Sequence, residues 1–435
     1  MKRKLGYFIA SGITILWVLF FYQYVLFHQN IQELDPNEGA NRKIKHLSAL
    51  FDDVHNLEQD SEKIKQYVER VQEVIGVDGG DSSLAVLRKE IPVIPVIVFG
   101  CNRPTIKRSL DQLIKFRPSA QSFPVYVSQD CGDAATADAI ASYGDQLTHL
   151  KHTNNTPINL SKKDKKFEGY YKIARHYKWG LQQMFRKYNY SAVIIVEDDL
   201  DVAPDFFQYF AALYPLLALD TSLWCISAWN DNGKADLTEN NAELLHRTDF
   251  FPGLGWMLTK EIWNELEPKW PEKFWDDWMR RPEQRQQRSC IRPEISRTST
   301  FGKKGVSNGE FFETHLKFIK LNDVAVPFRE RNLAYLLKEI YDPRFNSIVY
   351  NAPVIRLDDW KQKEIVGLPD NAAVRIEYRT KDQFIKIAKA IGVMQDFKAG
   401  VPRGGYRGVV TLVHRGRRVF LAPPAGWDGY DLTWN

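Results

Sequence analysis

An apolar run without charged residues lies near the beginning of the chain. Residues 5–27 contain no Asp, Glu, Lys or Arg. At about 1.5 Å per residue, a helix of this length spans the roughly 30 Å hydrocarbon core of a bilayer. The apolar stretch of a cleaved signal peptide is shorter and ends in small residues, whereas this run ends in Tyr24-Val25-Leu26-Phe27. The pattern therefore predicts an uncleaved membrane anchor.

The charges that flank this anchor predict its orientation. Lys2, Arg3 and Lys4 precede it, and residues 28–90 contain 13 acidic and 8 basic residues. Because basic segments stay on the cytoplasmic side, residues 1–4 are predicted to be a cytoplasmic tail. The remainder of the chain is then lumenal or extracellular, where disulfide bonds persist.

Residues 28–91 are predicted to form a helical stem. Apolar positions alternate three and four residues apart, as in a coiled-coil seam, with one polar break at Ser61. The apolar seam positions are Leu47, Leu50, Val54, Leu57, Ile64, Val68, Val71 and Ile75. Two interpretations stay open: stems that self-associate, and a single amphipathic helix that lies on the next domain. Residues 76–83 (GVDGGDSS) are typical of a linker.

From residue 92 onward, apolar strands alternate with amphipathic helices. Strands are predicted over residues 93–100, 123–128, 147–152, 191–196 and 223–228. Helices are predicted over residues 105–116, 133–143, 169–188 and 206–214. This alternation predicts an α/β domain with a mostly parallel sheet over residues 92–342. Residues 343–435 are predicted to form a smaller α+β unit, with a strand, a helix and a C-terminal hairpin at 374–378, 382–392 and 409–422.

Polar and acidic residues follow the predicted strands directly. The carboxyl ends of parallel strands meet at one edge of the sheet, where ligands bind. At that edge lie residues 101–104 (CNRP), 129–132 (QDCG), 197–199 (EDD) and 229–232 (WNDN). The three adjacent carboxylates of 197–199 repel one another unless a proton or cation intervenes, and oxygen ligands suit Mg²⁺ or Mn²⁺. The triplet favours a divalent metal site over an ordinary acidic turn.

Composition narrows the classes of protein that fit. Of the 435 residues, 44% are hydrophobic, which excludes global disorder and collagen-like or low-complexity assemblies. The net charge of +5 is too small to indicate a nucleic-acid partner. No glycine-rich phosphate loop of standard spacing is present, which weighs against a kinase or a dinucleotide oxidoreductase.

The chain has four cysteines: Cys101, Cys131, Cys225 and Cys290. They are too few for a disulfide-built scaffold, and no CxxC pair suggests a zinc ribbon. If the first two strands are neighbours, Cys101 and Cys131 lie within reach of a bridge, which leaves the other two as a second pair. The sequence alone allows three pairings.

Seven longer motifs occur between residues 92 and 435. They are residues 129–132 (QDCG), 169–177 (GYYKIARHY), 196–200 (VEDDL), 227–233 (SAWNDNG), 250–256 (FFPGLGW), 274–284 (FWDDWMRRPEQ) and 292–298 (RPEISRT). With these motifs the chain resembles the N-acetylglucosaminyltransferase I family. The resemblance implies a glycosyltransferase A-type fold in a type II Golgi membrane protein with a lumenal catalytic domain.

The resemblance also implies an activity. The expected reaction is Mn²⁺-dependent, inverting transfer of N-acetylglucosamine from UDP-N-acetylglucosamine. The acceptor would be a terminal mannose of a high-mannose N-glycan and the new linkage β1,2, which starts hybrid and complex glycan synthesis. The protein is also expected to contact the membrane through residues 5–27 and to have no nucleic-acid partner.

Residue roles follow from the matching motifs as further implications of the resemblance. Asp199 is expected to be the direct metal ligand, Asp198 to hold the donor ribose and Glu197 to lie against the donor sugar. Asp276 is expected to be the catalytic base. Ser307, in the loop of residues 301–309, is expected to touch the diphosphate when the loop orders on donor binding.

Three more residues are expected to recognise the nucleotide: Arg103, Asp130 and His176, the last two near the uracil. The resemblance implies two disulfides, Cys101 with Cys131 and Cys225 with Cys290.

Plainer interpretations of the same residues stay open. Asp276 can be a helix N-cap or an ion-pair partner of Arg280, and Asp277 is equally placed for the base role. His176 can be a satisfied helix-face histidine, and Asp130 a turn residue. Trp275 and Trp278 are expected to desolvate Asp276 and stack on sugar, and Lys303 and Lys304 to attract phosphate, unless their loop is an ordinary surface loop.

The C-terminal unit is rich in arginine: Arg403, Arg407, Arg415, Arg417 and Arg418. They predict either a docking face or a solvated basic face. Sequons begin at Asn154, Asn159 and Asn189. Three other functions remain as alternatives: a relative that modifies O-linked mannose, an inactive glycan-binding homologue, and a glycosidase, which also uses paired carboxylates.

Overall fold

The computed structural model describes residues 92–153, 156–303, 305–306, 309, 311–362, 368–369 and 371–435. All of them belong to one compact unit, Arg70–Asn435. The predicted tail, anchor and stem, and also Ser307, Lys304 and Asn154, lie outside the described residues. Among the described helices, none has the length and apolar character needed to cross a membrane.

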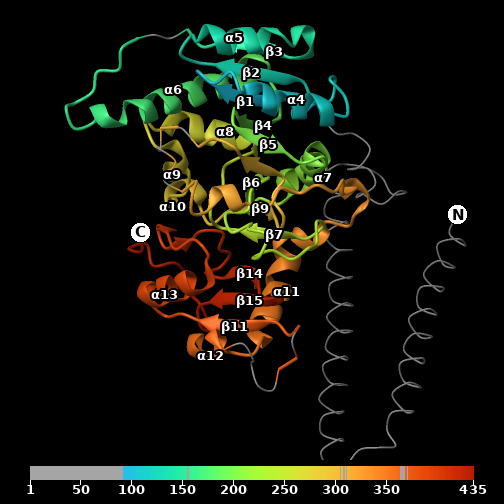
Figure 1. Ribbon diagram of the computed structural model, residues 1–435, viewed down its shortest axis with the longest axis vertical. Coiled ribbons are helices and arrows are strands. Elements are labelled where there is room, and N and C mark those ends of the chain that lie inside the picture. Colours follow the sequence, from blue (N-terminus) through green and yellow to red (C-terminus); the bar gives the residue numbers. More distant parts are fainter. Residues whose placement is uncertain are drawn as a thin grey trace, which may run out of the picture. The chain divides into compact units, whose positions relative to one another are not determined.

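An eight-stranded sheet forms the centre of the described chain, in the order β3-β2-β1-β4-β8-β6-β9-β7 (Figure 1). Its strands are β1 Val96–Gly100, β2 Val125–Gln129, β3 Thr148–Lys151, β4 Ala192–Glu197, β6 Leu223–Ser227, β7 Leu245–Thr248, β8 Trp256–Thr259 and β9 Ser289–Pro293. β8 pairs antiparallel with both β4 and β6, and β7 antiparallel with β9, while the other pairs are parallel. The predicted mostly parallel α/β sheet is confirmed.

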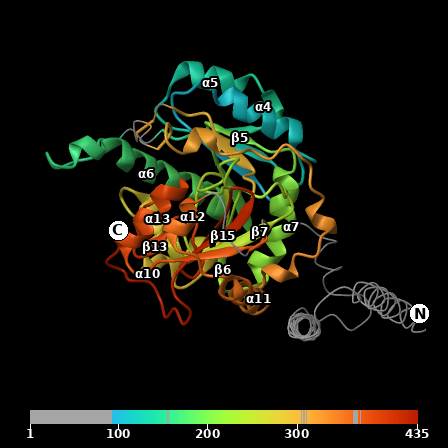
Figure 2. The same cartoon turned by 60° about the horizontal axis from the view of Figure 1, so that its bottom comes forward.

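Helices cover both faces of this sheet. They are α4 Ile106–Phe116, α5 Ala134–Ala141, α6 Glu168–Gln182, α7 Phe206–Leu219 and α8 Lys260–Leu266. Both views show α6 and α7 on opposite sides of the strands (Figures 1 and 2). The alternate residues Ile97 and Phe99 of β1 pack against α6, and a Cβ at Gly180 would meet the Phe99 ring at 2.5 Å. Glycine at 180 therefore lets this helix lie close to the sheet.

The structure adds three strands to the sheet that the apolar pattern does not predict. β8 has only four residues, and β7 (LHRT) and β9 (SCIRP) carry buried charged side chains. Arg247 of β7 is 1% exposed and pairs with Asp220, with 2.9 Å between Arg247 Nη1 and Asp220 Oδ2. Such pairing permits polar side chains in a buried strand, which an apolar pattern cannot reveal.

Shorter elements line the edge of the sheet where β1, β2 and β4 end. They are the β5–β10 pair (Leu200–Val202 with Thr298–Thr300) and α9 Trp275–Met279, which the short helix α10 Pro282–Arg285 follows along the chain. β5 follows the acidic triplet directly, so the chain turns at Asp198-Asp199. The triplet therefore connects β4, which pairs with β1 and β8, to β5, which pairs with β10.

A second, three-stranded sheet forms the C-terminal unit, in the order β11-β15-β14. Its strands are β11 Val374–Glu377, β14 Val410–His414 and β15 Arg417–Ala422, with the small β12–β13 hairpin (Phe397–Lys398, Val401–Pro402) beside them. Its helices are α11 Lys338–Asn351, α12 Leu357–Lys361 and α13 Lys381–Ile391. The predicted strand, helix and hairpin are all present, and the predicted boundary at residue 343 falls inside α11.

Most arginines of this unit have acidic partners within the chain. Arg403 pairs with Asp231 and Asp396, Arg407 with Asp342, and Arg418 with Glu239 and Glu294. Arg415 and Arg417 donate to backbone carbonyls, and Arg415 is exposed. Arg403, Arg407 and Arg418 thus join segments of the chain, while the docking face and the solvated face both stay predictions.

Both expected disulfides are present. Cys101–Cys131 joins the residues that follow β1 and β2, with Cα atoms 5.5 Å apart. Cys225–Cys290 joins β6 to β9, and both residues are fully buried. The bridges close loops with sequence separations of 30 and 65 residues.

We expect the longer loop to give the larger stabilisation. Removing the β6–β9 bridge with Cys225→Ala and Cys290→Ala should lower the free energy of unfolding by about 4 kcal/mol, and removing the other bridge by somewhat less. Urea denaturation of the two double variants measures both. An unchanged transition midpoint in the β6–β9 variant would contradict this prediction.

Candidate functional site

Three carboxylates meet at the end of β4. A Cβ at Gly100, where β1 ends, would lie 3.3 Å from Asp198 Oδ2, so the triplet lies against the neighbouring strand. Tyr177 of α6 donates its hydroxyl hydrogen to Glu197 Oε1 at 2.7 Å. The ends of β4 and β1, together with α6, thus hold these carboxylates at the edge of the sheet that the sequence predicts.

Arg103 is the cation that faces the triplet. Its Nη1 lies 3.2 Å from Asp198 Oδ1, and it also pairs with Asp199. The loop after β10 covers the same point: the Phe301 N–H donates to the Asp199 carbonyl at 3.0 Å, and a Cβ at Gly302 would overlap Asp199 Oδ2. Glycine at 302 thus lets the loop pass over Asp199 without displacing the Asp199 and Arg103 side chains.

One guanidinium does not balance this charge. Burial, and then the nearby Asp199, raise the pKa of Glu197 to about 7, although the Tyr177 hydrogen bond acts the other way. Burial also raises the pKa of Asp198 to about 7, against the opposing effect of Arg103. A further cation at this point would stabilise the ionised carboxylates.

The donor set fits a hard divalent cation. Asp199 presents carboxylate oxygens at the edge of the sheet, with a side chain 17% exposed. Among the described residues, no group of three or more His, Cys, Asp or Glu side chains is placed to hold a metal by itself. A cation at this edge would therefore need ligands from outside the protein in addition to a carboxylate such as that of Asp199.

A polar wall lies beside the triplet at the ends of β2 and β3. His152 Nδ1 and Asp130 Oδ1 are 3.1 Å apart, and His176 Nε2 lies 2.8 Å from Ser128 Oγ. The two imidazole rings stack with centroids 5.4 Å apart and 6° between their planes. Asp130 and His176, predicted to recognise a base, are thus brought together, and His152 joins them.

Burial and hydrogen bonding set the charges on this wall. Burial lowers the pKa of His176 to about 4, so the ring is neutral at pH 7. Burial would raise the pKa of Asp130, but the hydrogen bonds from His152 and the Cys131 N–H outweigh it and lower the pKa. The wall combines the neutral, buried imidazole of His176 with the ionised carboxylate of Asp130.

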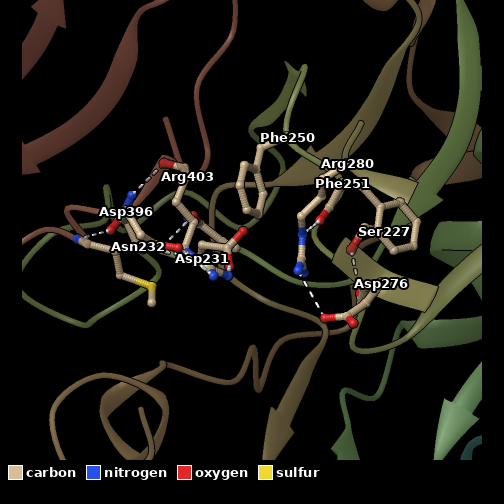
Figure 3. A network of polar contacts seen from close by, with 12 residues as sticks. Ser227, Asp231, Asn232, Phe250, Phe251, Asp276, Arg280, Asp396 and Arg403 are labelled. Atoms are coloured by element: carbon tan, nitrogen blue, oxygen red, sulfur yellow. Dashed lines mark hydrogen bonds and ion pairs between the residues drawn. The ribbon is translucent and has the colours of Figure 1, made fainter. Parts of the chain in front are cut away.

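Asp276 lies in the first turn of α9, with its side chain 46% exposed. It is not a helix N-cap, because Phe274 holds that position in the left-handed conformation at φ 51°. The alternative ion pair is present, with Arg280 Nη1 2.9 Å from Asp276 Oδ2 (Figure 3).

Asp276 is linked to the triplet through stacked rings. The Trp275 ring stacks on the ring of Tyr177 with centroids 4.4 Å apart, and Tyr177 bonds Glu197. Burial raises the pKa of Glu197 most, followed by Asp199 and Asp198, and Asp276 adds a smaller contribution, so Glu197 and Asp276 are within electrostatic reach. One region therefore holds four acidic side chains.

One expectation about neighbouring side chains is wrong. Trp275 is 7% exposed and packs in the core, so its ring presents no open face to a sugar. Lys303 pairs with Glu313 at 2.7 Å and its side chain is 69% exposed, so its attraction of phosphate stays a prediction.

Sequence reasoning missed several residues of the site. Tyr177 is the last residue of the 169–177 motif, and His152 is the last residue of a predicted strand, but the sequence predicts no role for either. Lys398 and Arg403 come from the C-terminal unit and lie more than 100 positions from Asp277 and Asp231, which they contact. No local pattern signals such long-range pairs.

Comparisons with known proteins agree with these motifs. The model of the GNT-I family matches residues 8–434. The alpha-1,3-mannosyl-glycoprotein 2-beta-N-acetylglucosaminyltransferase of Arabidopsis thaliana is 41% identical over 338 residues, which cover 77% of this chain and 75% of the relative.

Solved structures show weaker likeness. The Pyrobaculum calidifontis mannosyltransferase PcManGT, in complex with GDP-Man and Mn²⁺, is 16% identical, with a TM-score of 0.29 over 49% of this chain and 56% of that one. TarS 1-349 of S. aureus is 13% identical, with a TM-score of 0.34 over 47% and 59% of the two chains. Structural similarity at these TM-scores supports no inference about the site.

The buried His176 should make stability depend on pH. The unfolded chain protonates this imidazole below about pH 6.5, whereas the folded chain keeps it neutral down to about pH 4. Stability is therefore lost as the pH falls through this range, by up to about 3 kcal/mol for this group. Urea denaturation at a series of pH values should show a shallower loss for His176→Gln. A difference between wild type and variant that is independent of pH would contradict this prediction.

Proposed function

The chain belongs to the GNT-I family, and from that membership we propose that it transfers N-acetylglucosamine from UDP-N-acetylglucosamine to a terminal mannose of high-mannose N-glycans. The product linkage is β1,2 with inversion, and this step starts hybrid and complex glycan synthesis. The observation that carries the proposal is the acidic triplet after β4, which Tyr177 and Trp275 connect to Asp276. The sheet and this edge are in keeping with a glycosyltransferase A-type domain.

Inversion requires one direct displacement at the anomeric carbon, with the acceptor hydroxyl as the nucleophile. Asp276 accepts the proton of that hydroxyl, and its half-exposed side chain is accessible to an acceptor. Glu197, held by Tyr177, lies against the donor sugar, and Asp198 binds the ribose. Asp130 and His176 receive the base on the polar wall.

We further propose that Mn²⁺ is the cofactor and that Asp199 holds it. One or two carboxylates together with substrate phosphate oxygens are a common ligand set for such ions. When bound, the ion supplies positive charge to the leaving diphosphate. Arg103 adds a second positive charge at the same place.

The anchor and location are also proposals. The family model begins at residue 8, inside the apolar run, and two disulfides suit an oxidising compartment. We propose a single-pass type II protein of the Golgi membrane with a lumenal catalytic domain. Self-association through the stem stays a prediction. Asn159 and Asn189 are exposed, so both sequons are accessible to glycosylation.

Transfer and its metal dependence can be tested together. The full-length chain, incubated with UDP-N-acetylglucosamine, Mn²⁺ and a five-mannose N-glycan, should form one β1,2 linkage, detected by mass spectrometry and linkage analysis. A chelator should lower the rate by about 100-fold or more, and Mn²⁺ should restore it. Transfer only to an O-linked mannoside would favour the relative that modifies O-mannose. Glycan binding without transfer would favour an inactive homologue, and release of sugar a glycosidase.

The base role of Asp276 predicts a selective loss. Asp276→Asn should lower kcat by about 10²- to 10⁴-fold because the amide cannot accept the proton. Calorimetry should find the UDP dissociation constant unchanged within about twofold, since Asp276 does not hold the nucleotide. Asp277→Asn is the matched control and should keep most of the rate. Loss of UDP binding in Asp276→Asn would show a donor-binding or structural role instead.

A further inference from the structure

Arg280 is fixed at both ends of its guanidinium. It is 7% exposed, its Nε donates to the Phe251 carbonyl at 3.1 Å, and its Nη1 lies 2.9 Å from both Asp276 Oδ2 and Asp277 Oδ1. An arginine held by a backbone carbonyl presents its remaining donors in a fixed direction. The exposed carboxylate of Asp276 thereby acquires a rigid partner.

The C-terminal unit packs against this arginine through an aromatic ring. Phe250 lies between two guanidinium groups, with Cζ of Arg280 and Cζ of Arg403 each 4.8 Å from its centroid (Figure 3). Arg403 is itself held by Asp231 at 3.0 Å and Asp396 at 2.6 Å. Because Phe251 follows Phe250, fixing this ring also fixes the carbonyl that anchors Arg280.

A second contact from the same unit acts on Asp277. Lys398 Nζ, at the end of β12, lies 3.0 Å from Asp277 Oδ2. Burial opposes the charge on Asp277, but Arg280 and Lys398 outweigh it and lower the pKa of this carboxyl. Asp277 therefore forms ion pairs with both Lys398 and Arg280. Without Lys398, Asp277 would compete more strongly with Asp276 for Arg280.

We propose that Arg280 is a positioning residue that holds the carboxylate of Asp276 for proton transfer, and that the C-terminal unit keeps Arg280 in place through Arg403, Phe250 and Lys398. This inference rests on the proposed function, because it takes Asp276 as the base. A misplacement of about 1 Å can cost about 10²-fold in rate, so a half-exposed base needs such support.

The test compares kcat, KM and UDP binding in the full-length chain. Arg280→Lys keeps the charge but loses the fork geometry, and it should lower kcat by about 10- to 100-fold. Lys398→Met and Arg403→Lys should lower kcat by about 3- to 10-fold. KM for the donor and the UDP dissociation constant should stay within about twofold in all three.

Matched controls come from the same unit. Arg407→Lys changes an arginine that pairs with Asp342, and Lys389→Met changes a lysine of α13. Both should keep the wild-type kcat. If Arg280→Lys fails to fold, Lys398→Met carries the same test, because Lys398 is 35% exposed and its loss leaves no buried charge. A kcat that falls equally in the controls would overturn the inference.

A double variant separates positioning from general damage. If Arg280 acts through Asp276, then adding Arg280→Lys to Asp276→Asn should lower the residual rate no further. A further fall of 10-fold or more would overturn the inference and assign Arg280 a structural role. If the wild type transfers sugar and Arg280→Lys keeps the full kcat, this inference is overturned, but the proposed function is not. No transfer by the wild type would overturn the proposed function and this inference with it.

Discussion

The structure depends on one constraint: four acidic side chains must share a partly buried region at the end of β4. Glu197 and Asp198 ionise poorly there, because burial and mutual repulsion raise the pKa of each to about 7. The surrounding elements reduce this cost. Arg103, which follows β1, faces Asp198 and Asp199, and Tyr177 of α6 donates to Glu197. Arg280, the C-cap residue of α9, pairs with Asp276. The positions of β1, α6 and α9 around β4 are thus linked to charge as well as to packing.

The sequence predicts the first half of the fold well, because its parallel strands are apolar throughout. Runs such as VIVFG in β1 and AVIIVE in β4 leave little ambiguity. The prediction includes the strand, helix and hairpin of the C-terminal unit but misses β7, β8 and β9. Of these, β7 and β9 bury Arg247 and Arg292 among apolar neighbours. Whether a charged residue is buried depends on partners distant in sequence, and an apolar pattern contains no information about them.

The site shows the same division. Glu197 ends β4, and Asp198, Asp199, Asp130 and Arg103 lie just beyond strand ends, so their common edge can be predicted from topology. The base role of Asp276 depends on the family resemblance, since Asp277 has equal claim by spacing. The sequence predicts Arg280 only as an ion-pair partner of Asp276. It does not predict the contacts of Lys398 and Arg403, because nothing local connects the β12–β13 hairpin to α9.

The strand order also constrains how the chain can fold. β8 lies between β4 and β6 although it is made after both, and β9, made later still, pairs with β6. Until the nascent chain has reached about residue 256, the edges of β4 and β6 that later pair with β8 therefore have no partner strand. Non-local pairing of this kind slows folding and exposes strand edges. During synthesis the β3-β2-β1-β4 half can assemble first, whereas the contacts between Arg280 and the C-terminal unit form only after residues 397–403 have been made.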